Sequence, residues 1–159
     1  MQSTQSVYRL RLADRKLFSA VLDALRSTCP IASSLDLLGD RWTLVVMRDV
    51  LLTGCHTFSE IGTEEGIATN VLADRLARLT AVGLLERRKS SQDGRRRIYL
   101  PTERGIDLLP VLMELVVWGD THTQGRNQAE FAEAIRRDRG AVLKQLEVRA
   151  RGWIRGSTP

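Results

Sequence analysis

The residues with the clearest capacity for chemistry in this 159-residue sequence are a run of cations at positions 87–97. The run reads Arg-Arg-Lys-Ser-Ser-Gln-Asp-Gly-Arg-Arg-Arg, with six positive charges and one negative charge. The formal net charge of the whole chain is +5, so this short segment accounts for the entire excess. Such a concentration of charge is typical of an element that binds phosphate groups, although a solvated run that aids solubility is the simpler interpretation.

A second group of polar residues lies on a helix predicted over residues 69–81. At about 100° per residue, Leu72, Leu76 and Leu79 share one face, which should point to the core. Asn side chains can bond adenine and Asp can accept from cytosine N4, so the opposite face suits the major groove, or is merely solvated. We expect Arg75 to reach either a phosphate or an intramolecular ion pair. The candidate DNA-contacting residues of this helix are Thr69, Asn70, Ala73, Asp74, Arg75 and Arg78.

A β-hairpin is predicted directly after this helix, with strands at about 84–89 and 96–100. Asp93-Gly94 lies between the strands, and Asp-Gly is a strong hairpin signal. The candidate DNA-contacting residues of the hairpin are Arg95, Arg96 and Arg97. Alternation along a strand should place the first and third of these on one face and the second on the other. We expect the hairpin tip to contact phosphate or the minor groove.

The elements before the hairpin predict a helix-turn-helix. Thr57 and Glu60 have the spacing of a capping box, which predicts a short helix from Thr57 to about Glu65. Gly66 should form the turn before the 69–81 helix. The fold class is therefore mainly α (α+β), a winged helix-turn-helix with a two-stranded wing and terminal dimerisation helices.

Helical periodicity extends on both sides of this unit. The other predicted helices cover residues 14–27, 31–38, 41–52, 103–122 and, in the tail, about 127–149. Asp40 should cap the third helix of the chain, Pro110 should kink or break the 103–122 helix, and Gly140 should divide the tail.

Three segments follow from this pattern. They are an N-terminal dimerisation arm (1–27), a winged-helix DNA-binding domain (28–122) and a C-terminal helical extension with a flexible end (123–159). The apolar stripes of the 14–27 and 103–122 helices exceed what a small winged-helix core can cover. Exposed stripes of that size mark partner surfaces, which predicts a homodimer.

The order and spacing of several motifs across residues 28–120 resemble the HxlR-type winged-helix regulators of bacteria and archaea. The matching segments are Cys29-Pro30-Ile31, Leu38-Gly39-Asp40-Arg41-Trp42, Leu44 to Leu51, Phe58-Ser59-Glu60-Ile61, Leu72-x-x-Arg75-Leu76-x-x-Leu79, Gly83-Leu84-Leu85-x-Arg87, Tyr99-x-x-Thr102-x-x-Gly105 and Trp118-Gly119. The resemblance implies a homodimer that binds an inverted repeat and senses a chemical signal, often a reactive one. The sequence departs from the family at Thr57, at Ala68, at Gln92-Asp93-Gly94 and in the tail beyond residue 122.

We therefore expect a sequence-specific regulator of transcription that binds double-stranded DNA as a homodimer. We expect a repressor, with DNA binding switched by a reactive species or a small ligand. The alternative is a protein-interaction or dimerisation module with only non-specific affinity for nucleic acid. That alternative would explain the apolar helices but not the concentrated charge of the hairpin.

Two kinds of effector site are compatible with the sequence. Cys29 aligns with the cysteine that resembles a redox or electrophile sensor in some family members, and a helix N-terminus would lower its thiol pKa. The alternative interpretation is that Cys29 is a small, buried apolar residue without a sensing role. A small apolar ligand could instead bind between the terminal helices and the core, although its candidate lining is equally typical of plain core. That candidate lining consists of Trp42, Met47, Met113 and Trp118.

Other classes of function have little support in the sequence. It contains no Gly-rich phosphate loop, no His-Glu-x-x-His motif and no constellation of paired carboxylates, so we expect neither an enzyme nor a cofactor. The spacing of two cysteines and two histidines does not predict a metal site. There is no apolar run of the roughly 20 residues that a membrane helix needs, and no visible signal peptide, so we expect a cytoplasmic protein.

Overall fold

The computed structural model describes residues 27–90, 93–125 and 128–156. Its elements, in chain order, are α2 (Pro30–Leu38), α3 (Thr43–Arg48), the π-helix η1 (Asp49–Thr53), α4 (Thr69–Ala81), β1 (Leu85–Lys89), β2 (Arg97–Pro101), α5 (Glu103–Ile106), α6 (Leu109–His122), α7 (Ala129–Arg137) and α8 (Arg139–Ile154). The predicted fold class is confirmed, because the described part is mainly helical with one antiparallel pair of strands. The predicted 14–27 helix lies outside the described residues.

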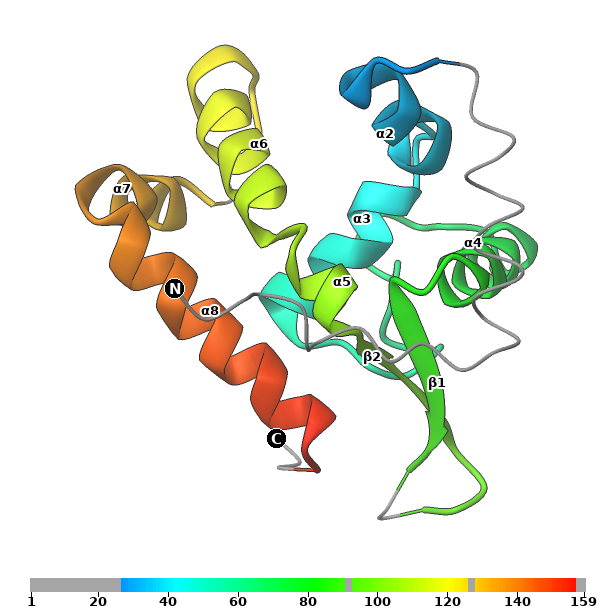
Figure 1. Cartoon of the computed structure of the whole chain (residues 1–159). Helices are drawn as coiled ribbons and strands as arrows, with labels where there is room; N and C mark the ends of the chain where they lie inside the picture. Colours follow the sequence, from blue (N-terminus) through cyan, green and yellow to red (C-terminus); the bar gives the residue numbers. More distant parts are fainter. Residues whose placement is uncertain (1–26, 91–92, 126–127, 157–159) are drawn as a thin grey trace, which may run out of the picture.

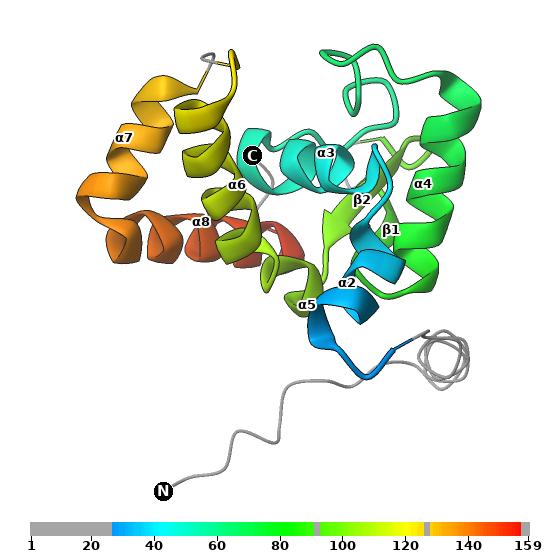
Figure 2. The same cartoon turned by 90° about the horizontal axis from the view of Figure 1, so that it is seen from above.

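The hydrophobic core is centred on α3 and η1. Val46, Met47, Val50 and Leu51 of these elements are fully buried. On one side lie α4 and the hairpin, and on the other lie α6, α7 and α8 (Figures 1 and 2). The three leucines of α4 that periodicity assigned to the core are all buried there. None of the described helices is both long and apolar enough to span a membrane.

The C-terminal helices belong to the same core. Ile135 of α7 and Leu146, Ala150 and Trp153 of α8 are buried in one hydrophobic cluster with the winged-helix residues. The helical prediction for the tail is confirmed, but the predicted division at Gly140 is wrong. The break falls at Asp138, whose backbone leaves the helical region and whose carboxylate accepts a hydrogen bond from the N–H of Ala141 at 2.9 Å. Gly140 therefore lies in the capped first turn of α8.

The short helix predicted from Thr57 to about Glu65 is wrong, because this segment forms consecutive turns. The predicted capping contact does form: the Glu60 carboxylate accepts hydrogen bonds from the backbone N–H groups of His56 and Thr57 at 3.0 and 2.9 Å. The turn cannot continue as a helix because Gly62 has φ +74°, in the left-handed region. The first half of the helix-turn-helix is thus reduced to capped turns.

Other boundaries follow their local signals. The carboxylate of Asp40 accepts the N–H groups of Trp42 and Thr43, so the buried helix begins at Thr43 rather than at Arg41. Gly54, with φ +76°, ends η1. The 103–122 helix is broken between α5 and α6, and Pro110 occupies the first turn of α6, where its missing N–H has no helical partner to lose.

The hairpin formed by β1, β2 and the turn between them is called the wing from here on. Its strands pair in the antiparallel register Leu85↔Pro101, Arg87↔Tyr99 and Lys89↔Arg97. Thr57 adds an isolated bridge to Ile98, which fixes the second strand of the wing to the capped turns. The predicted strands are confirmed to within about a residue, and the wing projects away from the helices (Figure 1).

Candidate nucleic-acid interface

The exposed face of α4 begins at the first residue of the helix. Ala68 stands at the N-cap and supplies no side-chain cap. The first helical hydrogen bond runs from the Leu72 N–H to the Ala68 carbonyl, at 2.9 Å. The first N–H groups of the helix therefore remain without intrahelical partners, which suits a negatively charged ligand. The exposed side chains on this face are Thr69, Asn70, Ala73 and Asp74.

The two arginines predicted for this helix have intramolecular partners. The Arg75 guanidinium pairs with Asp40 at 3.0 Å and with Asp74 at 2.9 Å, and its side chain is 19% exposed. Arg78 donates to the backbone carbonyl of Asp36 in α2 at 2.6 Å. Of the two alternatives for Arg75, the structure shows the intramolecular ion pair. Both arginines fix the position of α4 against preceding elements.

Asp40 is the acidic partner that anchors this arrangement. Partial burial alone would raise the pKa of its carboxyl group. Hydrogen bonds from the Thr43 hydroxyl and from the Trp42 and Thr43 N–H groups, together with the Arg75 guanidinium, outweigh burial and lower that pKa. The carboxylate thus stays charged while it orients both α3 and α4.

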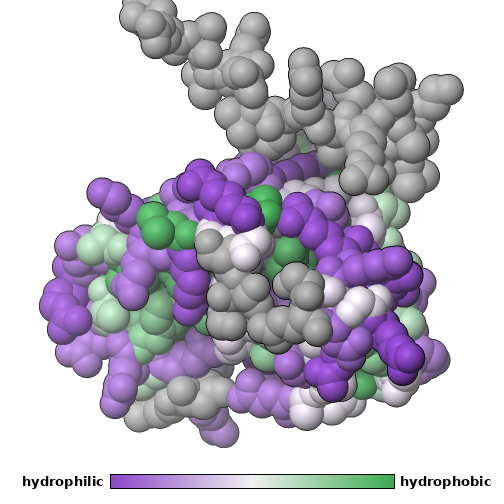
Figure 3. Space-filling model, turned by 90° about the horizontal axis from the view of Figure 1, so that it is seen from below, coloured by the Kyte–Doolittle hydropathy of each residue, from purple (hydrophilic) through white to green (hydrophobic). Residues whose placement is uncertain are grey.

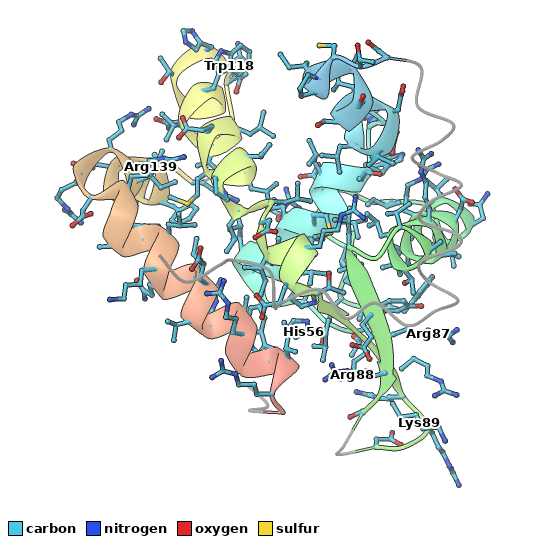
Figure 4. The ribbon with its side chains drawn as sticks, in the orientation of Figure 1. His56, Arg87, Arg88, Lys89, Trp118 and Arg139 are labelled. Atoms are coloured by element: carbon cyan, nitrogen blue, oxygen red, sulfur yellow. The ribbon has the colours of Figure 1, made fainter. Side chains whose placement is uncertain are left out.

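The wing presents its cations on two faces. Arg87 and Lys89 of β1 project on the side of α4, whereas Arg88 projects toward α8 (Figure 4). Lys89 lies directly opposite Arg97 in the register, and like charges in that position destabilise a strand pair. Neither of these two side chains has an ion-pair partner among the described residues. A bound anion would relieve this repulsion.

The described residues of the turn at the tip of the wing, 93–96, are exposed. Because β2 begins at Arg97, Arg95 and Arg96 lie in the turn, and the predicted strand alternation does not reach them. Arg96 lies 3.8 Å from Asp93, a weak and exposed contact, and Arg95 has no side-chain partner among the described residues. Seen from below, much of the molecule's surface is hydrophilic, with smaller apolar patches between the hydrophilic side chains (Figure 3).

Sequence reasoning placed Arg95, Arg96 and Arg97 among the candidates but omitted Arg87 and Lys89. The signal that could have found them is the same alternation, which puts Arg87 and Lys89 on one face, together with Arg97, the cross-strand partner of Lys89. Arg88 falls on the other face and donates to the Ile154 carbonyl at 2.7 Å.

Cys29 is exposed and stands at the N-cap of α2, so its interpretation as a small buried residue is wrong. The backbone N–H groups of Ala32 and Ile31, at the start of α2, lower the thiol pKa, as expected at a helix N-terminus. The thiolate is therefore more available than that of an ordinary cysteine.

The four residues suggested as a ligand pocket lie in three different environments, and their role in binding a ligand stays a prediction. Met47 and Met113 are fully buried in the core. Trp118 is 59% exposed, and its ring packs against His122 with centroids 5.2 Å apart. Trp42 is half-buried beneath the Arg41 guanidinium. Within the described residues, no three His, Cys, Asp or Glu side chains are arranged to hold a metal ion.

An α-helix with an open amino end beside a wing of free cations defines a winged helix-turn-helix protein of the DNA-binding type. Residues 37–127, more than half of the chain, match the sequence model of the HxlR-like helix-turn-helix family, and the protein belongs to that family. The resemblance noted in the sequence is thus confirmed.

Named relatives are regulators of transcription. The chain is 36% identical over 92 residues to the uncharacterized HTH-type transcriptional regulator Rv3095 of Mycobacterium tuberculosis, a match that covers 58% of each protein. It is 35% identical over 94 residues to the HTH-type transcriptional regulator YodB of Bacillus subtilis, covering 58% of this chain and 83% of YodB. The chain thus matches little more than half the length of the mycobacterial relative.

Solved structures agree with this assignment. PA1607, described as a candidate transcription factor, superposes with a TM-score of 0.58 at 30% identity, covering 64% of this chain and 70% of PA1607. The reduced form of YodB superposes with a TM-score of 0.50 at 33% identity, covering 62% of this chain and 97% of YodB.

Proposed function

We propose that this protein is a sequence-specific regulator of transcription, a repressor, that binds double-stranded DNA as a homodimer on an inverted repeat. The observation that carries the proposal is the combination of an exposed, uncapped N-terminus on α4 with a wing whose Arg87, Lys89 and Arg97 have no partners among the described residues. Both features are satisfied by DNA phosphates, and membership of the family supports duplex DNA as the ligand.

Different residues would supply affinity and specificity. Cations of the wing would neutralise phosphates, which gives strong but sequence-independent binding. The α4 helix would enter the major groove, where Asn70 can bond an adenine edge and Asp74 can accept from cytosine. Ala73 lies on the same exposed face and allows the helix backbone to come close to the bases.

A homodimer is supported by uncovered apolar side chains on α6 and α2. Val111, Leu115 and Trp118 follow helical spacing on one face of α6 and are 44%, 45% and 59% exposed. On α2, Ile31 and Leu35 are 73% and 56% exposed. Apolar stripes of this kind mark partner surfaces. Pairing through α6, with the 14–27 helix as a second element, would set two α4 helices about 34–36 Å apart, in successive major grooves.

The switch that we propose for this regulator is the Cys29 thiol. Cys29 is exposed, has a lowered pKa and precedes Ile31 on α2, so its modification would act beside the proposed dimer surface. Wild type and Cys29→Ser should be treated with diamide or a quinone while DNA binding is followed. We expect only the wild type to lose affinity. An equal response of both proteins, or of neither, would assign the signal to a non-covalent ligand or to none.

Selection from random duplexes tests the central proposal. The expected result is an enriched motif with two inverted half-sites, whose affinity falls steeply as salt concentration rises. Binding that depends on salt but yields no enriched motif would favour the alternative, an interaction module with non-specific affinity for nucleic acid. The variant Arg95→Ala/Arg97→Ala serves as the control for wing-dependent affinity.

A further inference from the structure

The C-terminal extension is attached to the winged helix by contacts with η1, with α5 and with both strands of the wing. It follows the family match, which ends at residue 127, before α7 begins. In α8, Arg149 donates to the carbonyls of Leu51 and Leu52 at 2.9 and 2.8 Å, at the end of η1. Arg151 pairs with Glu103 of α5 at 3.0 Å. These contacts fix the position of α8 against the core.

Trp153 links α8 to the second strand of the wing. Its side chain is buried, and its ring packs edge-on against His56, with centroids 4.5 Å apart and an interplanar angle of 73°. His56 exchanges two contacts with Tyr99 of β2: the Tyr99 N–H donates to the His56 carbonyl at 2.8 Å, and His56 Nδ1 lies 3.1 Å from the Tyr99 carbonyl oxygen. The ring of Trp153 therefore supports β2 through His56.

Arg88 links α8 to the first strand. Its guanidinium donates to the carbonyl of Ile154 at 2.7 Å and pairs with Glu86 at 2.8 Å. Ile154 is the last residue of α8, and carbonyls of a last helical turn lack intrahelical partners and carry partial negative charge. Arg88 is therefore held in place from both sides, and it projects away from Arg87 and Lys89 (Figure 4).

We propose that α8 holds the wing in its binding orientation and that Arg88 is a positioning residue, acting through the Ile154 carbonyl without contact to DNA. The proposal rests on the DNA-binding function proposed above. A two-stranded ribbon is marginally stable alone, and ordering a flexible element on binding weakens affinity. Contacts that order the wing before DNA arrives would remove much of that cost. Arg88 would thus raise affinity by ordering the wing, whereas neighbouring cations of the run would do so by neutralising phosphates.

Salt dependence separates the two routes, and Arg87→Ala is the matched control for Arg88→Ala. Both changes remove one positive charge from adjacent positions of β1. A residue that neutralises a phosphate reduces the slope of log affinity against log salt by about one when it is removed. We expect that reduction for Arg87→Ala.

For Arg88→Ala we expect affinity to fall about three- to tenfold, the effect of losing one hydrogen bond, with the wild-type slope retained. Arg88→Lys, which keeps a donor, should recover most of the affinity.

Hydrogen exchange in the DNA-free protein tests the positioning role directly. Amides of β1 and β2 should exchange faster in Arg88→Ala than in the wild type and in Arg87→Ala. Trp153→Leu should have the same effect on β2, and Arg88→Ala keeps the test valid if that core variant fails to fold. A reduced salt slope for Arg88→Ala, or unchanged exchange in its wing, would overturn the proposal. Should the wild type bind no DNA, the proposed function fails, while the exchange experiment still decides whether α8 orders the wing.

Discussion

At the scale of single residues, the wing and α4 should make separable contributions to DNA recognition. Arg95→Ala with Arg97→Ala should weaken binding to all sequences alike and lower the salt slope by about two, because these side chains are free to contact phosphates. Asn70→Ala should change affinity by about 1–3 kcal/mol at particular base pairs only. Competition binding with single-base variants of the selected site measures both effects.

Thr69→Ala is a suitable control for the α4 substitution, because Thr69 is exposed at the first helical position but has a weaker capacity to distinguish bases than an amide. If Asn70→Ala lowers affinity equally for every sequence, Asn70 does not contact a base.

His56 should make stability depend on pH. Burial is the main cause that lowers its pKa below the ordinary value of 6.5, aided by the nearby Arg149; the Tyr99 carbonyl and Glu60 oppose the shift. Because the folded pKa is lower, the unfolded state binds more protons between the two values. The stabilising contribution is therefore complete above about pH 6.5 and is lost as pH falls through the folded pKa.

We expect the free energy of unfolding of the wild type to drop more between pH 7 and more acidic values than that of His56→Asn, which retains a donor near the Nδ1 position. Denaturant titrations at several pH values give the comparison. Equal slopes for wild type and His56→Asn would refute this origin of the pH dependence.

The sequence predicts which residues are candidates for the site better than it predicts the intramolecular contacts that those residues make. The run at 87–97 locates the cations by composition alone. Strand alternation separates Arg88 from Arg87 by face, but nothing local shows what Arg88 contacts there, since its partner is a carbonyl 66 residues away in sequence. Arg75 and Arg78 likewise look free on a helical wheel, but they meet Asp40 and Asp36 only after the chain has folded.

At the scale of elements, prediction succeeded where the signals were local and failed where one residue overrode them. The bounds of α4 are as predicted, because leucine spacing and Gly83 act within the segment. The helix expected after Thr57 fails at Gly62, where the left-handed backbone and the Ile67 side chain both require glycine. A β-carbon at Gly62 would stand only 2.8 Å from the Ile67 side chain. In the tail, the side-chain cap at Asp138 decided the helix break, and Gly140 had no part in it.

Two glycines should respond in opposite ways to alanine. Gly83 has φ +72°, and the N–H groups of Gly83 and Leu84 bond back to Thr80 and Leu79, which closes the end of α4. Gly83→Ala should destabilise the protein by about 1–2 kcal/mol, the cost of left-handed backbone for an L-residue. Gly140 is helical and its nearest neighbour would be at an ordinary contact distance, so Gly140→Ala should stabilise by about 0.5–1 kcal/mol. Thermal or denaturant unfolding of both variants provides the measurement, and stabilisation by Gly83→Ala would contradict the argument.

At the scale of the whole molecule, the sequence showed which segments are helical but not that they share one core. The apolar stripe of the tail was visible, but the sequence did not show that its partners within the chain are α6, η1, α5 and β2. Such long-range packing depends on how elements far apart in sequence meet. The apolar residues left uncovered after this packing are therefore more informative than the stripes themselves. Among the described helices, α6 carries three such residues on one face and α2 carries two.

The assembly should depend on the uncovered face of α6. Leu115→Asp would place a charge at the centre of the stripe formed with Val111 and Trp118, and burying that charge without a partner should weaken dimerisation by at least about 3 kcal/mol, more than about a hundredfold. Light scattering after size exclusion should then show a monomer with an unchanged circular dichroism spectrum. Affinity for the inverted repeat should fall toward that for a single half-site, since one α4 helix must act alone.

Val148→Asp is the matched control, because Val148 is 65% exposed on α8, outside the stripe. It should leave both assembly and DNA binding unchanged. A protein lacking residues 1–27 addresses the other proposed dimer element and should become monomeric or insoluble. If Leu115→Asp remains a dimer, the subunits associate through another surface, and the spacing between recognition helices would have to be derived from that surface. If the truncated protein is a well-behaved dimer, α6 alone suffices, and the N-terminal segment has no essential part in holding the two α4 helices in register with the DNA.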